Sequence, residues 1–281
     1  MIRDRFPSEQ EQRTLYTKTL KGVHPLPVIM RTLDIGGDKN LSYFPIDEIN
    51  PFLGWRGVRV TLDHPEIFLV QVRAMLSASL GLNNLAIMLP MVTSLNELIE
   101  SKKLISQAYQ ELRDEGLDIV FPKIGILIEV PAAAYNIEDF MPHVNFISVG
   151  TNDLTQYVLA VDRNNSRVAN LYDHYHPALI KILAYIARTA RKHKIPAGVC
   201  GEMATDPLAV ILLLAMEFSS LSMNYNSLAK IKWVIRNLKL SNCKQALDAA
   251  LQMHDPKSIK DHLKEVINQA GLGGLIRARE L

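Results

Sequence analysis

The sequence predicts an α/β protein, a (β/α)8 TIM barrel with extra helices at its C-terminal end. Three observations support this fold class. Short apolar runs alternate with amphipathic segments, about seven or eight such units fit into roughly 220 residues, and helix-start signals stand between them. The same alternation also allows an open, doubly wound parallel sheet, which we keep as the alternative.

Apolar runs and capping signals locate the individual elements. Six runs are predicted to form strands, at residues 28–34, 85–91, 123–130, 145–151, 196–202 and 219–224. Ser94 and Glu97 form a capping-box pattern for a helix that ends at Gly116. Asp206 followed by Pro207 is typical of an N-cap and a first-turn proline. Helices are therefore expected between successive strands.

The chain is expected to have three parts. Residues 1–24 are predicted to be a linker and helix from a preceding domain, because a glycine and two prolines follow that helix. Residues 25–240 would form the barrel, and residues 241–281 a C-terminal helical extension.

Composition excludes several classes of protein. A net charge of +2 gives no basic stripe for nucleic acid, and the polar N-terminus lacks the apolar core of a signal peptide. The longest apolar stretch, at about residues 208–216, is too short to span a bilayer. Only two cysteines are present and they form no CxxC pair, which argues against a disulfide framework or zinc site. We expect a cytoplasmic protein with no membrane or nucleic-acid partner.

Carboxylates follow two of the predicted strands. Glu129 ends the 123–130 run and Asp153 follows the 145–151 run. Catalytic groups in a parallel barrel come from the carboxyl ends of strands, and a buried carboxylate is costly unless it is paired or binds a metal. Two such oxygen ligands suit Mg²⁺. The alternative is that each carboxylate caps the helix that follows it.

Arginines also stand near predicted strand ends, where they could hold a small dianion through paired hydrogen bonds. They are Arg31, Arg56, Arg59, Arg73 and Arg163. The alternative for any one of these arginines is that it lies on the surface and contributes only to solubility. Cys200 could be a nucleophile, a general acid or an inert buried thiol, and the inert role is the commonest for a lone cysteine. His174 and His176 could chelate a metal, but a polar loop ahead of a helix is the better interpretation.

Several motifs resemble those of a known family. They are RTLDIGGDK, NPFLGWRGVR, QVRAML, GILIEVPAAA, FISVGTNDLTQYVLAVDR and GVCGEMATDP. In this order they resemble the phosphoenolpyruvate-utilising enzymes, and among these the enzyme I family of the phosphotransferase system. DRNNSRVANLYD and NQAGLGGLIR are similar to the nitrogen-related branch of that family. Two departures are Thr205, where a glycine is common, and Glu217-Phe218, where a glycine-containing turn is common.

The resemblance implies a role for each site residue. Phosphate and carboxylate would be held by Arg31, Arg56, Arg73, Arg163 and Asn152, with support from Lys39 and Glu202. Glu129 and Asp153 would bind Mg²⁺, and Cys200 would be the catalytic proton donor to the enolate of pyruvate.

The resemblance further implies transfer of phosphate from phosphoenolpyruvate to a histidine, with release of pyruvate, in a nitrogen-related regulatory phosphorelay. No GG-x-[ST]-S-H segment occurs in the sequence, so the acceptor histidine and contacts with an HPr-like phosphocarrier would belong to N-terminal domains outside this chain. A homodimer through this domain is also implied. Alternatives are a phosphoenolpyruvate-sensing dimerisation module and a related barrel enzyme, either a dikinase or a 2-oxo acid lyase.

Overall fold

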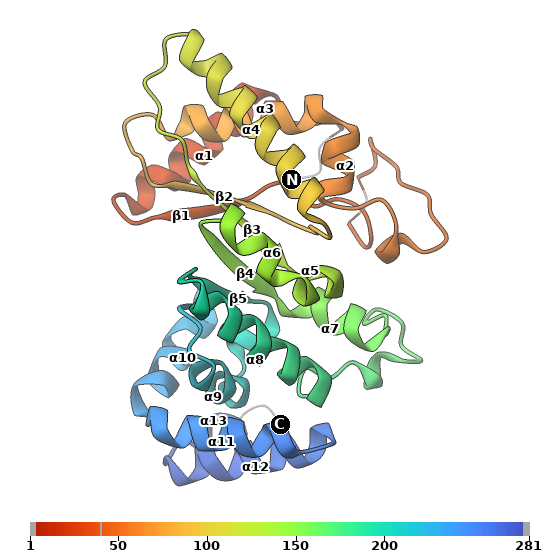
Figure 1. Ribbon diagram of the computed structural model, residues 1–281, viewed down its shortest axis with the longest axis vertical. Coiled ribbons are helices and arrows are strands. Elements are labelled where there is room, and N and C mark those ends of the chain that lie inside the picture. The colour runs from red at the N-terminus through yellow and green to blue at the C-terminus, as the bar shows by residue number, and fades with distance from the viewer. Residues whose placement is uncertain (1–3, 40, 278–281) are drawn as a thin grey trace. The chain divides into compact units, whose positions relative to one another are not determined.

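The structure is a computed structural model that describes residues 4–39 and 41–277. The chain divides into two compact units. The first holds the chain up to Leu127 together with His143–Phe146, and the second holds Ile128–Pro142 and the chain from Ile147 onward. Figure 1 shows both units, with the first in red to green and the second in green to blue.

The first unit is a layer of parallel strands covered by helices. Its strands are β1 (Val28–Arg31), β2 (Leu85–Leu89) and β3 (Lys123–Ile128), in that order. Its helices are α1 (Glu9–Val23), α2 (Val58–Asp63), α3 (Pro65–Ala78) and α4 (Leu95–Asp114), with a 3-10 turn η1 (Pro51–Leu53). α3 packs against both α1 and α4, so these three helices form one layer.

Local sequence explains these elements well. The predicted capping box is present, because the backbone N–H of Glu97 donates to Ser94 Oγ at 3.3 Å and the Glu97 carboxylate accepts from the backbone N–H of Ser94 at 3.0 Å. The buried residues of α4 recur at helical spacing, as Leu98, Ile105 and Leu112 illustrate. This apolar face packs toward α3. Capping and periodicity therefore agree on where α4 starts and which side it buries.

The second unit repeats the same alternation. Its strands are β4 (Phe146–Gly150), β5 (Ala197–Cys200) and β6 (Ser220–Ser222), again parallel and in sequence order. Its helices include α5 (Pro131–Tyr135), α6 (Ile137–Phe140), α7 (Thr151–Leu159), α8 (Pro177–Lys192), α9 (Pro207–Ala215) and α10 (Tyr225–Asn237). The 3-10 turns are η2 (Met141–His143), η3 (Ala169–Leu171) and η4 (Glu202–Thr205).

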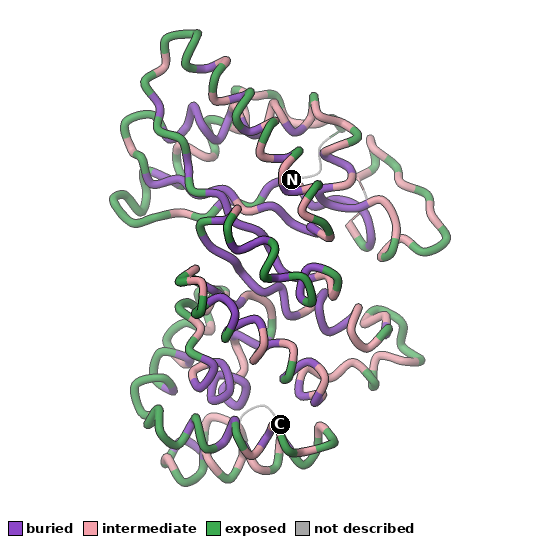
Figure 2. The backbone as a smooth tube through the Cα atoms, in the orientation of Figure 1, coloured by how far each residue is buried: buried purple, intermediate pink, exposed green. Residues whose placement is uncertain are grey.

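α9 forms the centre of the second unit. Every residue from Pro207 to Ala215 except Leu214 is buried, which Figure 2 shows as purple tube. A helix that is apolar on all sides must be covered on all sides. α10 covers one part of it, and α11 (Leu240–Gln252) and α12 (Pro256–Gln269) cover another. The last described helix is α13 (Gly274–Arg277). The predicted C-terminal helices are thus present.

Each of the six predicted strand runs contains a strand, but the described residues hold six strands and not the eight of a closed barrel. Strands follow sequence order within each unit, whereas a doubly wound sheet reverses its order at a switch point. α1 packs on α3, and α11 packs on α9, so both terminal segments have partners inside their own units. The three-part division of the chain stays a prediction.

Among the described helices, none is long and apolar enough to cross a membrane.

Candidate functional site

A buried carboxylate organises the first polar cluster, just after β1. The Asp34 side chain is fully buried and pairs with three cations. Its oxygens lie 3.1 Å from Arg31 Nη1 and 3.1 Å from Arg56 Nε, and Lys39 also contacts it. Arg56 Nη2 adds a second hydrogen bond at 3.3 Å. We call these four residues the Asp34 cluster. Three cations that are oriented by one buried carboxylate could also hold the oxygens of an anionic ligand.

The charge on Asp34 follows from two opposed effects. Burial raises the pKa of its carboxyl group, but the adjacent charge and hydrogen bonds of Arg56, together with Lys39, outweigh burial and hold the pKa below its usual value. Asp34 is therefore ionised at neutral pH. It orients the arginines, a role that the sequence analysis did not assign, although its place between Arg31 and Lys39 after an apolar run was a usable signal.

Two glycines allow the backbone to approach closely enough to build this cluster. Gly36 has φ +98°, and a Cβ there would lie 2.3 Å from the Trp55 carbonyl oxygen. Gly57 has φ +59°, and a Cβ there would lie 2.7 Å from Met91 Cβ. Larger residues would be strained in φ and would collide. Gly36 and Gly57 therefore allow the β1 loop to pack closely against the segment that carries Arg56.

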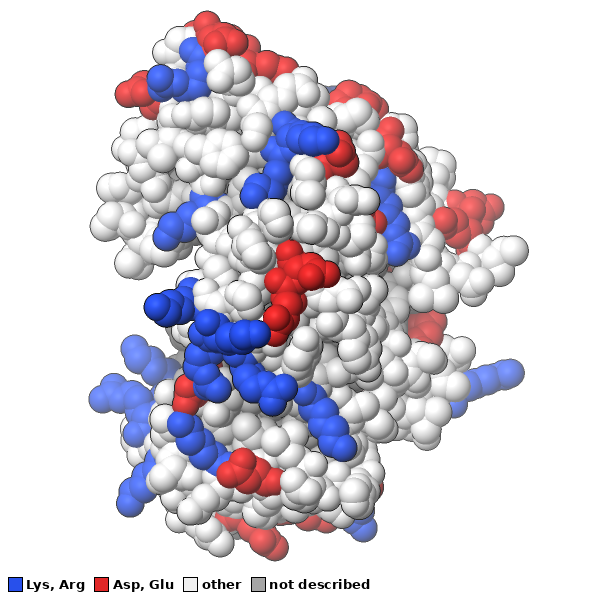
Figure 3. Space-filling model, viewed as in Figure 1, with Lys and Arg blue, Asp and Glu red and all other residues white. Residues whose placement is uncertain are grey.

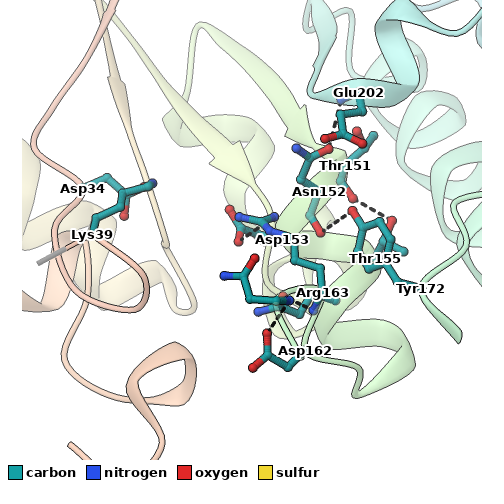
Figure 4. A network of polar contacts seen from close by, with 12 residues as sticks. Asp34, Lys39, Thr151, Asn152, Asp153, Thr155, Asp162, Arg163, Tyr172 and Glu202 are labelled. Atoms are coloured by element: carbon teal, nitrogen blue, oxygen red, sulfur yellow. Dashed lines mark hydrogen bonds and ion pairs between the residues drawn. The ribbon is translucent and has the colours of Figure 1, made fainter. Parts of the chain in front are cut away.

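A second cluster lies in the second unit, after β4 and β5. Thr151 Oγ1 donates to the Cys200 carbonyl oxygen at 2.9 Å, and the backbone N–H of Glu202 donates to Asn152 Oδ1 at 3.0 Å. Gly201 has φ +103°, and a Cβ there would lie 2.6 Å from Thr151 Oγ1. These contacts fix the ends of the two strands together, so Asn152 and Glu202 lie side by side (Figure 4).

The loop between α7 and α8, residues 160–176, brings two further groups to this cluster. Arg163 Nη1 lies 3.5 Å from Asp153 Oδ1, and the Tyr172 hydroxyl donates to the Asn152 carbonyl oxygen at 3.0 Å. Burial is the main cause that raises the pKa of Tyr172, and the charge of Arg163 opposes it. Tyr172 therefore stays a neutral donor. Figure 4 shows these side chains gathered at the start of α7. No local signal in the sequence marked Tyr172.

The predicted metal carboxylates are both withdrawn from solvent. Glu129 follows β3 and is 1% exposed, and Asp153 is 7% exposed. The helix-capping alternative finds no support, because the N-cap residues of α5 and α7 are Val130 and Gly150, which offer no side-chain cap. Buried carboxylates with this donor chemistry fit a hard divalent cation such as Mg²⁺. Their pairing around one ion stays a prediction.

Cys200 is the last residue of β5 and is half-buried, and its Sγ donates to the Val149 carbonyl oxygen at 3.4 Å. Neither Cys200 nor the buried Cys243 forms a disulfide. Cys200 is therefore more accessible than Cys243, which is fully enclosed in the core.

Arg73 does not join either cluster. Its guanidinium on α3 contacts three carboxylates, Glu9 at 3.0 Å, Glu111 at 2.9 Å and Glu115 at 2.8 Å. These carboxylates raise the pKa of Arg73 despite partial burial, which acts to lower it. Because all three guanidinium nitrogens are engaged in tying α1 and α4 to α3, the contacts support a structural role for Arg73, and its predicted role in ligand binding stays a prediction.

His174 and His176 lie in a polar loop ahead of α8, as the sequence analysis favoured. His176 Nδ1 accepts from the backbone N–H of Ala178 at 3.2 Å at the start of α8, and His174 Nε2 lies 3.4 Å from Asp206 Oδ2. Among the residues that the structure describes, no group of three or more His, Cys, Asp or Glu side chains is placed to hold a metal.

Parallel strands with helical crossovers, and charged clusters after their carboxyl ends, define the class: an α/β enzyme domain that binds a small charged ligand. Comparison with known proteins specifies the family. Residues 1–240 match the model of the PEP-utilising enzymes, PEP-binding domain. The chain therefore belongs to the phosphoenolpyruvate-utilising enzymes and matches their phosphoenolpyruvate-binding domain.

Relatives with known names support this membership. The chain is 48% identical over 278 residues to the "Phosphoenolpyruvate-dependent phosphotransferase system" protein of Escherichia coli K12, covering 99% of this chain and 37% of that protein. It is 39% identical to the phosphoenolpyruvate-protein phosphotransferase of Haemophilus influenzae, covering 97% of this chain and 48% of that protein. The chain thus spans between a third and a half of these relatives. Malate synthase of Haloferax volcanii shares the fold, with a TM-score of 0.51, 11% identity and coverage of 79% and 55%.

Proposed function

We propose that this chain is the phosphoenolpyruvate- and Mg²⁺-binding part of a phosphoenolpyruvate–protein phosphotransferase. The observation that carries the proposal is the Asp34 cluster, in which Arg31 and Arg56 are pre-oriented by a buried carboxylate. Together with the family membership, it supports a site for a small ligand that carries both phosphate and carboxylate.

Charge complementarity assigns the ligand groups. Arg31, Arg56 and Lys39 would bind anionic oxygens of phosphoenolpyruvate, and so would Arg163 in the second cluster. Asn152 would donate from its amide, while Glu202 holds that amide in place through the bond from its own N–H. Arg163 Nη1 already lies 3.5 Å from Asp153 Oδ1, so Arg163 would bind the ligand next to this metal carboxylate.

Glu129 and Asp153 would hold Mg²⁺. Two carboxylates leave coordination positions for water and for ligand oxygens, as Mg²⁺ prefers. When bound, the ion would stabilise negative charge on the transferring phosphoryl group and on the enolate oxygen. The side chains of this domain would bind and orient the ligand next to the ion.

Cys200 would protonate the carbon left behind. In the forward direction the phosphoryl group passes to a histidine outside this chain, and the P–O bond to the enol oxygen breaks. The Cys200 S–H bond then breaks as a new C–H bond forms at the methylene carbon, which gives pyruvate and a thiolate. The position of Cys200 at the end of β5, where it is only half-buried, supports this role.

The finer features of the proposal come from the resemblance. We place the protein in the nitrogen-related phosphorelay, in the cytoplasm, as a homodimer, with an HPr-like phosphocarrier as the partner of domains outside this chain. The 48% identity to the Escherichia coli protein supports the phosphotransferase assignment.

Calorimetry tests the binding function. Phosphoenolpyruvate with Mg²⁺ should release heat on mixing with the folded chain, and Arg31→Gln should weaken binding. The matched control is Arg13→Gln, which removes an exposed arginine of α1 in the same unit and should leave affinity unchanged. Asp153→Asn should abolish the Mg²⁺ dependence. Absence of heat at millimolar ligand from a folded protein would reject the proposal.

Solvent exchange tests the role of Cys200. The wild-type chain should exchange the methyl protons of pyruvate for deuterium, and Cys200→Ser should bind phosphoenolpyruvate yet lose this exchange. Cys243→Ser is the control for the second thiol. If the isolated chain turns over phosphoenolpyruvate or cleaves a 2-oxo acid without any added protein, a lyase-type enzyme replaces the phosphotransferase proposal.

A further inference from the structure

The loop of residues 160–176 carries Arg163 and Tyr172, but it has little core of its own. Most of its residues are exposed or half-buried, and Val161 and Tyr175 are its buried ones. A loop with few buried contacts takes its position from whatever anchors it. The contacts at its C-terminal end, next to Tyr172, therefore bear directly on the candidate site.

The first anchor comes from the C-terminal helical extension. Lys260 of α12 donates to Asp173 Oδ2 at 2.6 Å, and Asp173 is the residue directly after Tyr172. Asp173 Oδ1 also accepts from the backbone N–H of Tyr175 at 2.9 Å. The Lys260 ammonium lies 5.3 Å from the centroid of the Tyr175 ring, within cation–π range. Lys260 thus contacts both residues that hold the end of the loop.

The second anchor connects the end of the loop to the residues of the second cluster. The buried Tyr175 hydroxyl donates to Asp206 Oδ2 at 2.8 Å, and Asp206 Oδ1 caps α9 by accepting from the backbone N–H of Leu208 at 3.0 Å. Asp206 follows the turn η4 directly, and η4 begins at Glu202, whose N–H is bonded to Asn152. The loop end is therefore held from two sides, by α12 and by the start of α9.

We propose that Lys260 is a positioning residue for the ligand site: its ion pair with Asp173 holds Tyr172 against Asn152 and keeps Arg163 within reach of Asp153. The C-terminal extension would thereby tune affinity for the anionic ligand without touching it. This inference rests on the proposed phosphoenolpyruvate-binding function. α11 and α12 pack on α9 within the second unit, so any displacement of the extension would be transmitted through Lys260.

Partial burial distinguishes Lys260 from the exposed Lys and Arg side chains of the second unit. Lys and Arg side chains are numerous on the second unit, and Figure 3 shows them standing out over α8 and α10. Lys260 differs because its side chain is 38% exposed and its partner carboxylate 22% exposed. A half-buried pair of this kind contributes little to global stability, so its loss should change loop position more than folding.

The test compares Lys260→Gln with Lys257→Gln, a control on the same helix that is exposed and makes no ion pair with the loop. Phosphoenolpyruvate should bind about fivefold more weakly to Lys260→Gln in calorimetry, while the urea midpoint stays near the wild-type value. Lys260→Arg should restore affinity. Amide hydrogen exchange within residues 160–176 should accelerate in Lys260→Gln alone, with or without ligand.

Several outcomes would overturn the inference. Unchanged affinity and unchanged exchange in Lys260→Gln, equal losses in both glutamine variants, or no recovery in Lys260→Arg each contradict a positioning role. The proposed function fails in a different way, because the wild-type chain itself would then show no binding. In that case the exchange rates of residues 160–176 still determine whether Lys260 anchors the loop.

Discussion

Asp34→Asn probes the centre of the first cluster. The side chains of Asp34 and Arg56 are both fully buried, so the substitution removes a buried negative charge that lies against the Arg56 guanidinium. Loss of one partner of a buried pair costs about 3–5 kcal/mol. We expect about 3 kcal/mol, the lower end, since the other two cations are 40% and 37% exposed and water can reach them.

Urea unfolding measures this loss, and its pH dependence identifies the cause. The folded-state pKa of Asp34 lies below its usual value, so its ionisation stabilises the fold above the unfolded pKa of about 3.9 and this contribution disappears as the pH falls through the folded pKa. The difference between wild type and Asp34→Asn should be constant from pH 7 to about 5 and shrink below about 4. Exposed Asp47 provides the control, Asp47→Asn. A loss below about 1 kcal/mol at pH 7, or one that ignores pH, would refute the reasoning.

Three further substitutions test other parts of the molecule. Arg73→Leu should cost about 1–2 kcal/mol in urea unfolding by removing three ion pairs, and a structural role predicts unchanged ligand affinity; weaker binding would instead support the predicted role of Arg73 in the ligand site. Gly201→Ala should weaken ligand binding and cost at least about 1 kcal/mol, because its methyl group would collide with Thr151 and Asn152 at φ +103°; normal affinity in calorimetry would contradict this. Ser94→Ala should cost about 1 kcal/mol through loss of the α4 cap, while Ser94→Asp, also a capping residue, should cost less.

The elements of the fold were accessible from sequence because their causes are local. The capping box of Ser94 and the N-cap of Asp206 act over three or four residues, and both are present. Strand locations followed from runs of apolar residues. The eightfold count was not confirmed, because counting units depends on how strands close a sheet, and the described residues supply six strands.

Residue type alone could not separate Arg56 from Arg73. Both are arginines in motifs of the family, but one is buried against Asp34 and the other is surrounded by three glutamates. The closest of these glutamates in sequence is 38 residues from Arg73, and the farthest is 64 residues away. Only the packing of α1 and α4 on α3 brings them together, so the distinction is tertiary.

The sequence by itself determined the parallel α/β class, the placement of Glu129 and Asp153 after strands, and the family. These depend on period, caps and contiguous motifs. Tertiary structure alone decided which charges meet: Asp34 with Arg56, and Lys260 with Asp173 across 87 residues of chain. The physical reason is that a buried charge needs a partner, and for Asp34 and Arg56 that partner lies 22 residues away, so no short segment of sequence identifies the pair.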